Sequence, residues 1–291
     1  MLRLVLPKGS LEEATLKLSG DADLPVRRES QRSYLASIDD PRVASVRILR
    51  PQEIPTYVAE GLFDIGITGR DWIEETSADV VTLSEFTYSK NTTNPIRVVL
   101  AVGGESGLER AEDLKDGVRV STEYPNLTRR YFERLGIRAH IYLSYGATEA
   151  KIPDIVDVIV ENTETGSSLR AAGLRVIDTI LTSYTELIAH PASFADAGKR
   201  RAMEQIRLLL QGALTARGKV LVKLNVAEDR LADVLGVLPA LHAPTVSPLA
   251  ENGFVAVETV VPKSEINLLI PRLSELGAEG ILEIPISKIV D

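Results

Sequence analysis

A glycine flanked by hydroxyl-bearing residues, at positions 163–168, is the part of this chain best suited to chemistry. A short apolar run rich in β-branched residues precedes it, and a helix-compatible segment follows it. At a turn from strand to helix, the first backbone N–H groups of the helix have no partner inside it, and hydroxyl side chains add donors. Converging donors of this kind bind phosphate. We therefore predict a phosphate cradle built on Thr165, Gly166, Ser167 and Ser168.

Two acidic residues precede this turn. Asp157 and Glu161 are four residues apart, so on an extended segment their side chains point to the same side. Carboxylates beside a bound phosphate suit ribose hydroxyls or a Mg²⁺ ion, and we predict both residues as catalytic and metal-binding. A plainer interpretation is open, in which the turn is only a capped helix start, because Ser and Thr are frequent N-caps. The turn is not a Walker A loop, since no G-K-[ST] follows the glycine.

Strands and helices must hold these groups in place. Strand-like apolar runs alternate with helix-compatible segments from Leu2 to Leu181, which predicts an α/β fold with mostly parallel sheets. Ligands of such folds bind beyond the carboxyl ends of the strands. The stretches around Lys8, Gly69, Ser121 and Thr165 all follow expected strands, so we expect them at that edge.

The first stretch follows a strand expected at residues 2–6. Ser10 and Glu13 fit a capping box that would start a helix lasting to about Leu18. Lys8 lies at this junction, and we predict that it reaches an anion. A single lysine at such a place is also commonly solvated, so this alternative is open.

The second stretch, residues 64–72, indicates a strand, a glycine turn and a helix. Gly69 permits close approach of a ligand or of another strand, and Asp71 lies in the first helical turn, where the helix dipole favours an acid. We predict Gly69, Arg70 and Asp71 as nucleotide- or phosphate-binding residues. Tight packing between strand and helix explains the spacing equally well.

An arginine pair follows the strand expected at residues 118–121. Pro125 suits the first turn of a helix that carries Arg129 and Arg130. For one of the pair, a solvated helix face is the better interpretation.

The last part of the chain has its own pattern. After a long helix at residues 193–217, a half-exposed strand, a helix, two strands around an Asn-Gly turn, a helix and a last strand follow one another. The order β-α-β-β-α-β is that of a ferredoxin-like unit. This segment carries no catalytic constellation, which favours a regulatory or assembly role.

Composition excludes several function classes. The 291 residues contain no cysteine, which excludes disulfides, thiolate catalysis and cysteine-ligated metals. Only His140, His190 and His242 are present, far apart, so a histidine metal site is not expected. The net charge of −8 argues against a nucleic-acid surface. No apolar run reaches the length of about 18 residues that a membrane span needs, and the N-terminus is too short for a signal sequence, so we expect a cytoplasmic protein with no membrane partner.

Several motifs together resemble ATP phosphoribosyltransferase, the enzyme that opens histidine biosynthesis. They are G-A-T-E at residues 146–149, V-D-V-I-V-E at 156–161, T-G-S-S-L-R at 165–170, D-I-G-I-T-G-R-D at 64–71, and T-E-Y-P-N-L-T-R-R at 122–130. The resemblance implies a Mg²⁺-dependent transfer of the phosphoribosyl group of 5-phosphoribosyl 1-diphosphate to N1 of the ATP adenine, with release of pyrophosphate. It extends the substrate-binding set to Thr163, Glu164, Thr165, Gly166, Ser167, Ser168 and Leu169. It also implies that Arg129 or Arg130 lies near phosphate, and of the two we predict Arg129.

The resemblance also implies the domain plan. Two lobes of the periplasmic-binding-protein type are expected, the first from residues 1–90 with 182–214, the second from residues 91–181. A ferredoxin-like (ACT-like) regulatory domain would follow at residues 215–291.

A further match concerns regulation. The segment H-A-P-T-V-S-P-L at residues 242–249 resembles a loop of the long form of the family, whose additional domain binds histidine as a feedback inhibitor. The resemblance implies a histidine site that includes His242, Ala243, Pro244, Thr245 and Ser247. It also implies homo-oligomers, a dimer and a hexamer.

The match is incomplete at two positions. Glu164 adds a carboxylate within the cradle, and Ser10 stands where the family often has arginine. Two alternatives remain from the residues themselves: a non-enzymatic two-lobed sensor for a small anion, and a different phosphoribosyltransferase.

Overall fold

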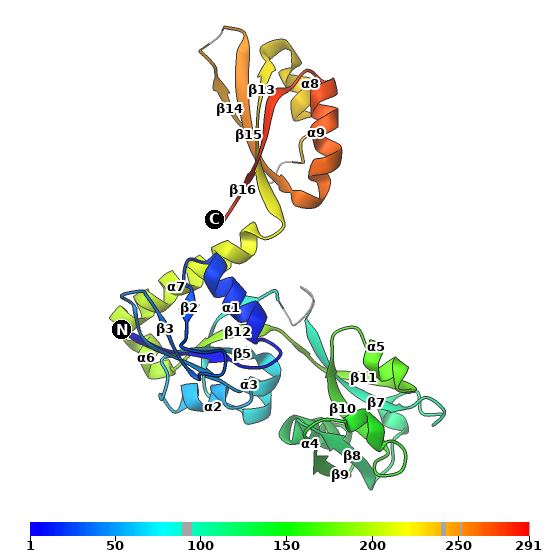
Figure 1. Ribbon diagram of the computed structural model, residues 1–291. Coiled ribbons are helices and arrows are strands. Elements are labelled where there is room, and N and C mark those ends of the chain that lie inside the picture. Colours follow the sequence, from blue (N-terminus) through cyan, green and yellow to red (C-terminus); the bar gives the residue numbers. More distant parts are fainter. Residues whose placement is uncertain (89–94, 240–242, 251, 291) are drawn as a thin grey trace. The chain divides into compact units, whose positions relative to one another are not determined.

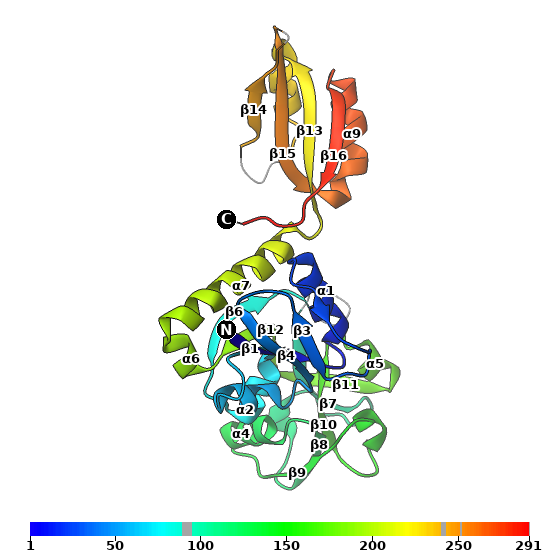
Figure 2. The same ribbon diagram turned by 60° about the vertical axis from the view of Figure 1, so that its left-hand side comes forward.

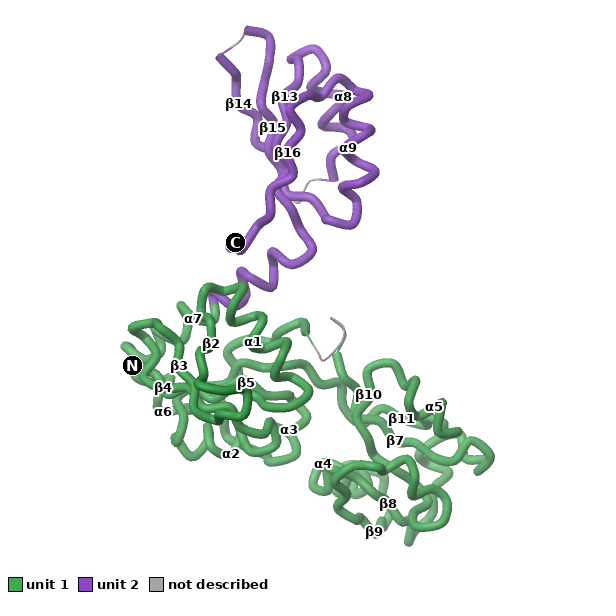
Figure 3. The backbone as a smooth tube through the Cα atoms, in the orientation of Figure 1, with its two compact units in different colours: residues 1–207 green, residues 208–291 purple. Residues whose placement is uncertain are grey.

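The computed structural model describes residues 1–88, 95–239, 243–250 and 252–290. They form two compact units, residues 1–207 and residues 208–291, coloured separately in Figure 3. Unit 1 contains two sheets, and we call each sheet with its helices a lobe. Unit 2 contains a third sheet.

Lobe I is built on a seven-stranded mixed sheet. In spatial order its strands are β2 (Val26–Arg27), β3 (Leu35–Ile38), β4 (Val43–Leu49), β1 (Leu2–Pro7), β5 (Ile65–Gly69), β12 (Thr185–Ala189) and β6 (Val81–Phe86). The central strands β4, β1 and β5 are parallel, and the flanking pairs are antiparallel. Helices α1 (Glu12–Asp21), α2 (Ile54–Ala59) and α3 (Arg70–Thr76) connect strands of this lobe. Figure 1 shows them around the sheet.

Lobe II is built on a five-stranded mixed sheet. Its spatial order is β11 (Leu174–Ser183), β7 (Ile96–Gly103), β10 (Val158–Thr163), β8 (Val118–Thr122) and β9 (Ala139–Leu143). Strands β10, β8 and β9 are parallel, whereas β7 is antiparallel to both of its neighbours. Short 3₁₀ turns lie at η1 (Ala111–Asp113) and η2 (Thr148–Lys151).

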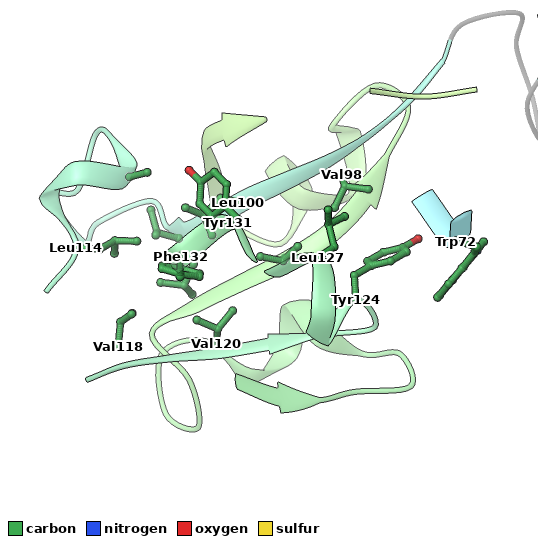
Figure 4. Packing of buried hydrophobic residues seen from close by; sticks show 14 residues of the cluster. Trp72, Val98, Leu100, Leu114, Val118, Val120, Tyr124, Leu127, Tyr131 and Phe132 are labelled. Carbon is green, nitrogen blue, oxygen red and sulfur yellow. The ribbon is translucent and has the colours of Figure 1, made fainter. Parts of the chain in front are cut away.

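The two faces of the lobe II sheet have separate cores. Helix α4 (Pro125–Leu135) packs on one face, where Val158 and Val160 belong to the same buried cluster as Tyr131 and Phe132. Figure 4 labels Tyr131 and Phe132 among other members of this cluster. Helix α5 (Ser167–Ala171) packs on the other face, where its Leu169 joins Ile159. Strand side chains alternate between faces, so β10 serves both cores at once.

Unit 2 begins within α7 (Ala197–Ala216), which follows α6 (Pro191–Ala195). Its sheet has the order β14 (Thr245–Pro248), β15 (Phe254–Pro262), β13 (Lys219–Ala227), β16 (Glu279–Pro285), and all pairs are antiparallel. Helices α8 (Leu231–Leu235) and α9 (Ile266–Glu275), with the turns η3 (Glu228–Arg230) and η4 (Lys263–Glu265), complete the unit. Figure 2 shows β13, β15 and β16 side by side.

The predicted fold class is confirmed. The molecule is α/β with two sheet-based lobes, and the last segment has the predicted β-α-β-β-α-β order. Parallel strands form the centre of the lobe I sheet and one side of the lobe II sheet, from β10 to the edge strand β9. The predicted capping box is wrong: α1 begins at Glu12 after Leu11, without a side-chain cap, because Ser10 still belongs to the preceding turn. No described helix is long and apolar enough to cross a membrane.

Candidate active site

The cradle has the predicted order of strand, glycine turn and helix. Gly166 lies between β10 and α5 with φ of +72°, a left-handed conformation that favours glycine. Its N–H donates to the Thr163 hydroxyl over 2.8 Å, which fixes the turn. The hydroxyls of Thr165 and Ser167 are 3.0 Å apart, and both residues are exposed, as is Ser168. The turn thus presents three hydroxyl groups to solvent.

Two of the predicted substrate-binding side chains have structural roles. Leu169 is 2% exposed and packs against Val99, Ala101 and Ile159, so its side chain cannot face a ligand. Its side chain instead anchors the five-residue helix, so any contact of Leu169 with substrate would be through its backbone N–H. Thr163 is also buried, with its hydroxyl accepting the Gly166 N–H. Glu164 is half-buried beside the exposed hydroxyls.

The two predicted acids are not brought together. Asp157 immediately precedes β10 and Glu161 lies within it, so about four residues of extended chain separate them by about 13 Å. Asp157 lies at the far end, where its carboxylate accepts from the Arg119 backbone N–H (2.9 Å) and from its Nη2 (2.6 Å). These hydrogen bonds hold the pKa of Asp157 below its usual range. The expectation that both carboxylates serve one site therefore fails on the register of the strand.

Glu161 does lie near the cradle, two residues before Thr163. Burial raises the pKa of Glu161, while a hydrogen bond from Thr148 opposes this and the charges of Glu123 and Glu149 reinforce it. Burial also raises the pKa of Glu123. Several acidic groups therefore gather near the carboxyl ends of β8 and β10. Among the described residues, however, no group of three or more His, Asp or Glu side chains is placed to hold a metal ion.

A lysine that the sequence analysis did not single out lies at the same edge. Lys151 Nζ donates to Ser121 Oγ at the end of β8 over 3.3 Å, and also to Ser144 Oγ just after β9. Ser144 Oγ is 3.4 Å from the Thr148 hydroxyl. The one sequence signal for Lys151 is its position in the loop that leads to β10, which also carries the G-A-T-E motif.

The corresponding turn of lobe I, between β5 and α3, is filled by protein groups. Asp71 is 2% exposed, and its two oxygens each accept a hydroxyl over 2.7 Å, one from Ser183 and one from Tyr124. Burial raises the pKa of Asp71. A Cβ at Gly69 would lie 2.1 Å from Asp71 Oδ1. The structure therefore uses Gly69 and Asp71 for internal packing, the alternative that the sequence left open.

The predicted arginines differ in their surroundings. Arg70 pairs with Glu85 over 3.3 Å and lies 4.0 Å from Glu186. Arg129 is exposed and donates to Asn126 over 2.9 Å. Its neighbour Arg130 instead donates to the Glu74 carbonyl and, over 3.2 Å, to the Ser77 hydroxyl of lobe I.

Lys8 lines a cavity of about 310 Å³ at the carboxyl ends of β1 and β4. Its Nζ lies 4.0 Å from the centre of the Tyr34 ring, a cation–π distance. Arg50 lies in the same cavity, so two cations face it. The cavity is lined by Lys8, Gly9, Ser10, Tyr34, Arg50, Pro51 and Gln52.

The predicted regulatory loop is partly described. Thr245 and Ser247 lie on β14, the edge strand of unit 2, and both are exposed. Ala243 is exposed and Pro244 half-buried. His242 lies outside the described residues.

Comparison with known proteins gives a consistent family. The family profile described as "ATP phosphoribosyltransferase" (HisG) matches residues 50–212, more than half of the chain. A second profile, "HisG, C-terminal domain", matches residues 216–288. The chain belongs to the ATP phosphoribosyltransferase family. The second match identifies it with members that carry the additional C-terminal domain.

Individual members of the family support this assignment over full length. The ATP phosphoribosyltransferase of Chlorobium phaeovibrioides is 48% identical over 291 residues, which is all of this chain and 98% of that one. The one from Solibacter usitatus is 48% identical over 290 residues and 99% of its length. A chain of the "ATP phosphoribosyl transferase (HisG:HisZ) complex from Thermotoga maritima" covers 72% of this chain and 99% of its own, with 28% identity and a TM-score of 0.62.

Proposed function

We propose that this chain catalyses the first step of histidine biosynthesis, the attack of N1 of the ATP adenine on C1 of 5-phosphoribosyl 1-diphosphate. The observation that carries the proposal is the exposed hydroxyl turn at Thr165, Ser167 and Ser168, in a chain that belongs to the ATP phosphoribosyltransferase family. Pyrophosphate is the leaving group. The products are phosphoribosyl-ATP and pyrophosphate.

The cradle would hold the 5′-phosphate of the sugar. The hydroxyls of Thr165, Ser167 and Ser168 and the backbone N–H groups that follow Gly166 supply the donors. Glu161, near the carboxyl end of the same strand, would accept from the ribose hydroxyls. Lys8 and Arg50, which share the cavity of lobe I, are suited to the triphosphate of ATP.

Mg²⁺ fits this site only together with substrate. The described residues offer no ligand set of three or more acidic or histidine side chains, but Mg²⁺ is commonly held by one or two carboxylates plus substrate phosphates. Glu161 is the protein carboxylate best placed for that role, and Asp157 is withdrawn from it by its pairing with Arg119. When bound, Mg²⁺ would supply positive charge that neutralises the diphosphate.

The protein's own contribution is positioning and electrostatic stabilisation. Departure of pyrophosphate leaves positive charge on the ribose ring, so no strong protein nucleophile is required. Holding two substrates in reacting geometry supplies a large part of the acceleration. The carboxylate of Glu161 would in addition stabilise the cationic ribose.

The decisive experiment measures pyrophosphate release. We expect release when ATP and 5-phosphoribosyl 1-diphosphate are both present, and none with either substrate alone. Release with the sugar diphosphate alone would indicate a hydrolase. Binding of the sugar diphosphate without release under any condition would favour a sensor.

The regulatory part of the proposal concerns unit 2. The match to the C-terminal domain profile supports a histidine site that includes Ala243, Pro244, Thr245 and Ser247, with His242 beside them. We also propose homo-oligomers, a dimer and a hexamer, and the division of the chain at residues 90, 182 and 215. The start of the second profile match at residue 216 supports the last of these boundaries. Histidine would shift the equilibrium between dimer and hexamer only by binding one of these two assemblies more tightly than the other. Histidine should therefore lower the rate and raise the sedimenting mass over the same concentration range. If histidine lowers the rate without changing the sedimenting mass, inhibition does not depend on assembly.

The cytoplasmic location stays a prediction.

A further inference from the structure

A buried chain of hydrogen bonds runs from lobe I to the strand that carries the cradle. In lobe I, Asp71 Oδ2 accepts from the Tyr124 hydroxyl over 2.7 Å. The same hydroxyl oxygen accepts from Asn162 Nδ2 over 2.9 Å. Asn162 belongs to β10, one residue before Thr163. The Asp71 carboxylate, the Tyr124 hydroxyl and the Asn162 amide nitrogen therefore each have a partner, as buried polar groups require.

Asp71 is held on both sides. Besides Tyr124, its carboxylate accepts from Ser183 Oγ over 2.7 Å, and the Asp71 backbone N–H donates to the same oxygen over 3.0 Å. Ser183 is the last residue of β11, immediately before the chain returns to lobe I. The carboxylate is therefore a fixed point to which the Tyr124 hydroxyl is attached.

Tyr124 itself has little freedom to move. It is completely buried, and its ring centre lies 4.5 Å from that of Trp72 on α3. Figure 4 shows the two rings side by side at one end of the lobe II core. Ring packing and two hydrogen bonds together fix the position of the hydroxyl between Asp71 and Asn162.

The side chains at the end of β10 alternate in their partners. Glu161 interacts with Thr148 on one face, Asn162 with Tyr124 on the other, and Thr163 with the Gly166 N–H on the first face again. Of these three residues, Asn162 is the one whose side chain is linked to lobe I, through the hydroxyl of Tyr124. The cradle begins at the next residue.

Other contacts join the lobes but stop at α4. Glu75 of α3 accepts from the backbone N–H groups of Asn126 (3.0 Å) and Leu127 (2.8 Å). Arg130 donates back to Glu74 and Ser77. These bonds hold the two helices together, whereas the chain through Tyr124 continues into the strand.

We propose that Asp71, Tyr124 and Asn162 form a positioning chain that sets the cradle of lobe II in register with the ATP cavity of lobe I. The three are positioning residues, since none of them is assigned to contact a substrate. The inference rests on the proposed function, because it requires that the two lobes each hold one substrate. Loss of the chain should then slow the transfer step more than it weakens binding of either substrate.

Tyr124→Phe removes only the hydroxyl and keeps the ring against Trp72. We expect kcat to fall 10- to 100-fold, because small misplacements of reacting groups cost rates of this order. The dissociation constant for 5-phosphoribosyl 1-diphosphate should change less than threefold. Asn162→Leu, which removes the last link at similar volume, should give the same pattern.

Tyr131→Phe is the matched control. Tyr131 lies on α4, the helix that Tyr124 immediately precedes. It is also buried, and its hydroxyl donates to Asp178, so the same deletion is made within lobe II alone. We expect Tyr131→Phe to lose about as much thermal stability as Tyr124→Phe does. Its kcat, however, should stay within twofold of that of the parent. A merely structural role for Tyr124 would make the two variants alike in kcat.

The double variant Tyr124→Phe/Asn162→Leu completes the test. Residues that act in one chain are not additive, so its kcat should match the lower of the two single variants. The proposal would be overturned if the losses of kcat in the two single variants multiplied in the double variant. It would also be overturned if the kcat of Tyr124→Phe equalled that of the parent, or if Tyr131→Phe lost as much kcat as Tyr124→Phe. If Tyr124→Phe does not fold, Asn162→Leu with the Tyr131→Phe control decides alone. A parent protein that binds no 5-phosphoribosyl 1-diphosphate would instead refute the proposed function.

Discussion

Two turns of unit 1 follow the same plan, a strand, a glycine and a helix, yet differ in what lies beside the glycine. In lobe I, Gly69 ends β5, and the carboxylate of Asp71 fills the space next to it. In lobe II, Gly166 follows β10, and the hydroxyls of Thr165 and Ser167 beside it face solvent. A Cβ at Gly166 would meet Arg170 Nη1 at 3.0 Å, so the space beside this glycine holds a guanidinium and not a buried carboxylate. One turn is closed by a buried acid, and the other is open, presenting hydroxyls and a cation to a ligand.

The difference arises from the chemistry of the side chains. A carboxylate is costly to bury unless donors reach it, and Asp71 obtains its donors from Tyr124 and Ser183, which are 53 and 112 residues away in sequence. Hydroxyl groups remain in water at no such cost. A glycine between strand and helix therefore predicts close approach, but the approaching group can belong to the protein itself.

The largest effect is expected at the open turn. Gly166→Val would place a branched side chain where phosphate should bind, and should weaken binding of 5-phosphoribosyl 1-diphosphate by more than about 100-fold, or about 3 kcal/mol. Its left-handed φ would also cost about 1–2 kcal/mol of stability. Calorimetric titration with each substrate measures this. ATP affinity should not change, and unchanged affinity for the sugar diphosphate would refute the cradle.

A substitution at Gly69, in the closed turn, should lower the stability of the fold. Gly69→Ala would bring a Cβ to 2.1 Å from Asp71 Oδ1 and force this buried carboxylate from its donors. We expect the free energy of unfolding to fall by about 3 kcal/mol, as measured by denaturant titration. Gly20→Ala is the control, because Gly20 is helical in α1 and a Cβ there meets nothing within 4 Å. An equal stability of the two variants would contradict the packing role of Gly69.

Local sequence was sufficient to predict most of the fold. The β-α-β-β-α-β order of unit 2 and the helix at Pro125 follow from turn residues and hydrophobic periodicity, which are local signals. The cradle was predicted for the same reason, since its hydroxyls and glycine are adjacent in the chain. Leu169 shows the limit, because burial of its side chain depends on packing against Val99 and Ile159.

What could not be predicted depends on pairing between distant segments. The register of β10 against β8 places Asp157 beside Arg119, so an acid that appeared catalytic belongs to an ion pair at the opposite end of the strand. Lys151 is brought to Ser121 by the same sheet. Neither the partner nor the register is encoded near these residues.

Asp157, just before β10, and Glu161, within it, provide a smaller test of the difference between a structural and a ligand-facing group. Glu161→Gln should lower kcat/KM about tenfold, through loss of charge near the ribose, whereas Asp157→Asn should leave turnover at every Mg²⁺ concentration within twofold. Because burial raises the pKa of Glu161, its carboxylate form is lost as pH falls through a value above the usual one for glutamate. The rate of the parent protein should therefore fall as the pH is lowered through that value. The rate of the Glu161→Gln variant should not show this decrease. Identical pH–rate profiles for the two proteins would remove Glu161 from the site.

The smallest effect concerns a single hydroxyl of the open turn. Ser168 lies in the first turn of α5 and is exposed, so Ser168→Ala should change neither the core nor the course of the chain. Loss of one hydrogen bond to phosphate costs about 1 kcal/mol, or about fivefold in KM for 5-phosphoribosyl 1-diphosphate. Ser274→Ala, at an exposed helical serine of unit 2, should leave that KM unchanged. If both variants match the parent, the phosphate is held by backbone N–H groups and the other hydroxyls, and the open turn binds through its conformation more than through Ser168.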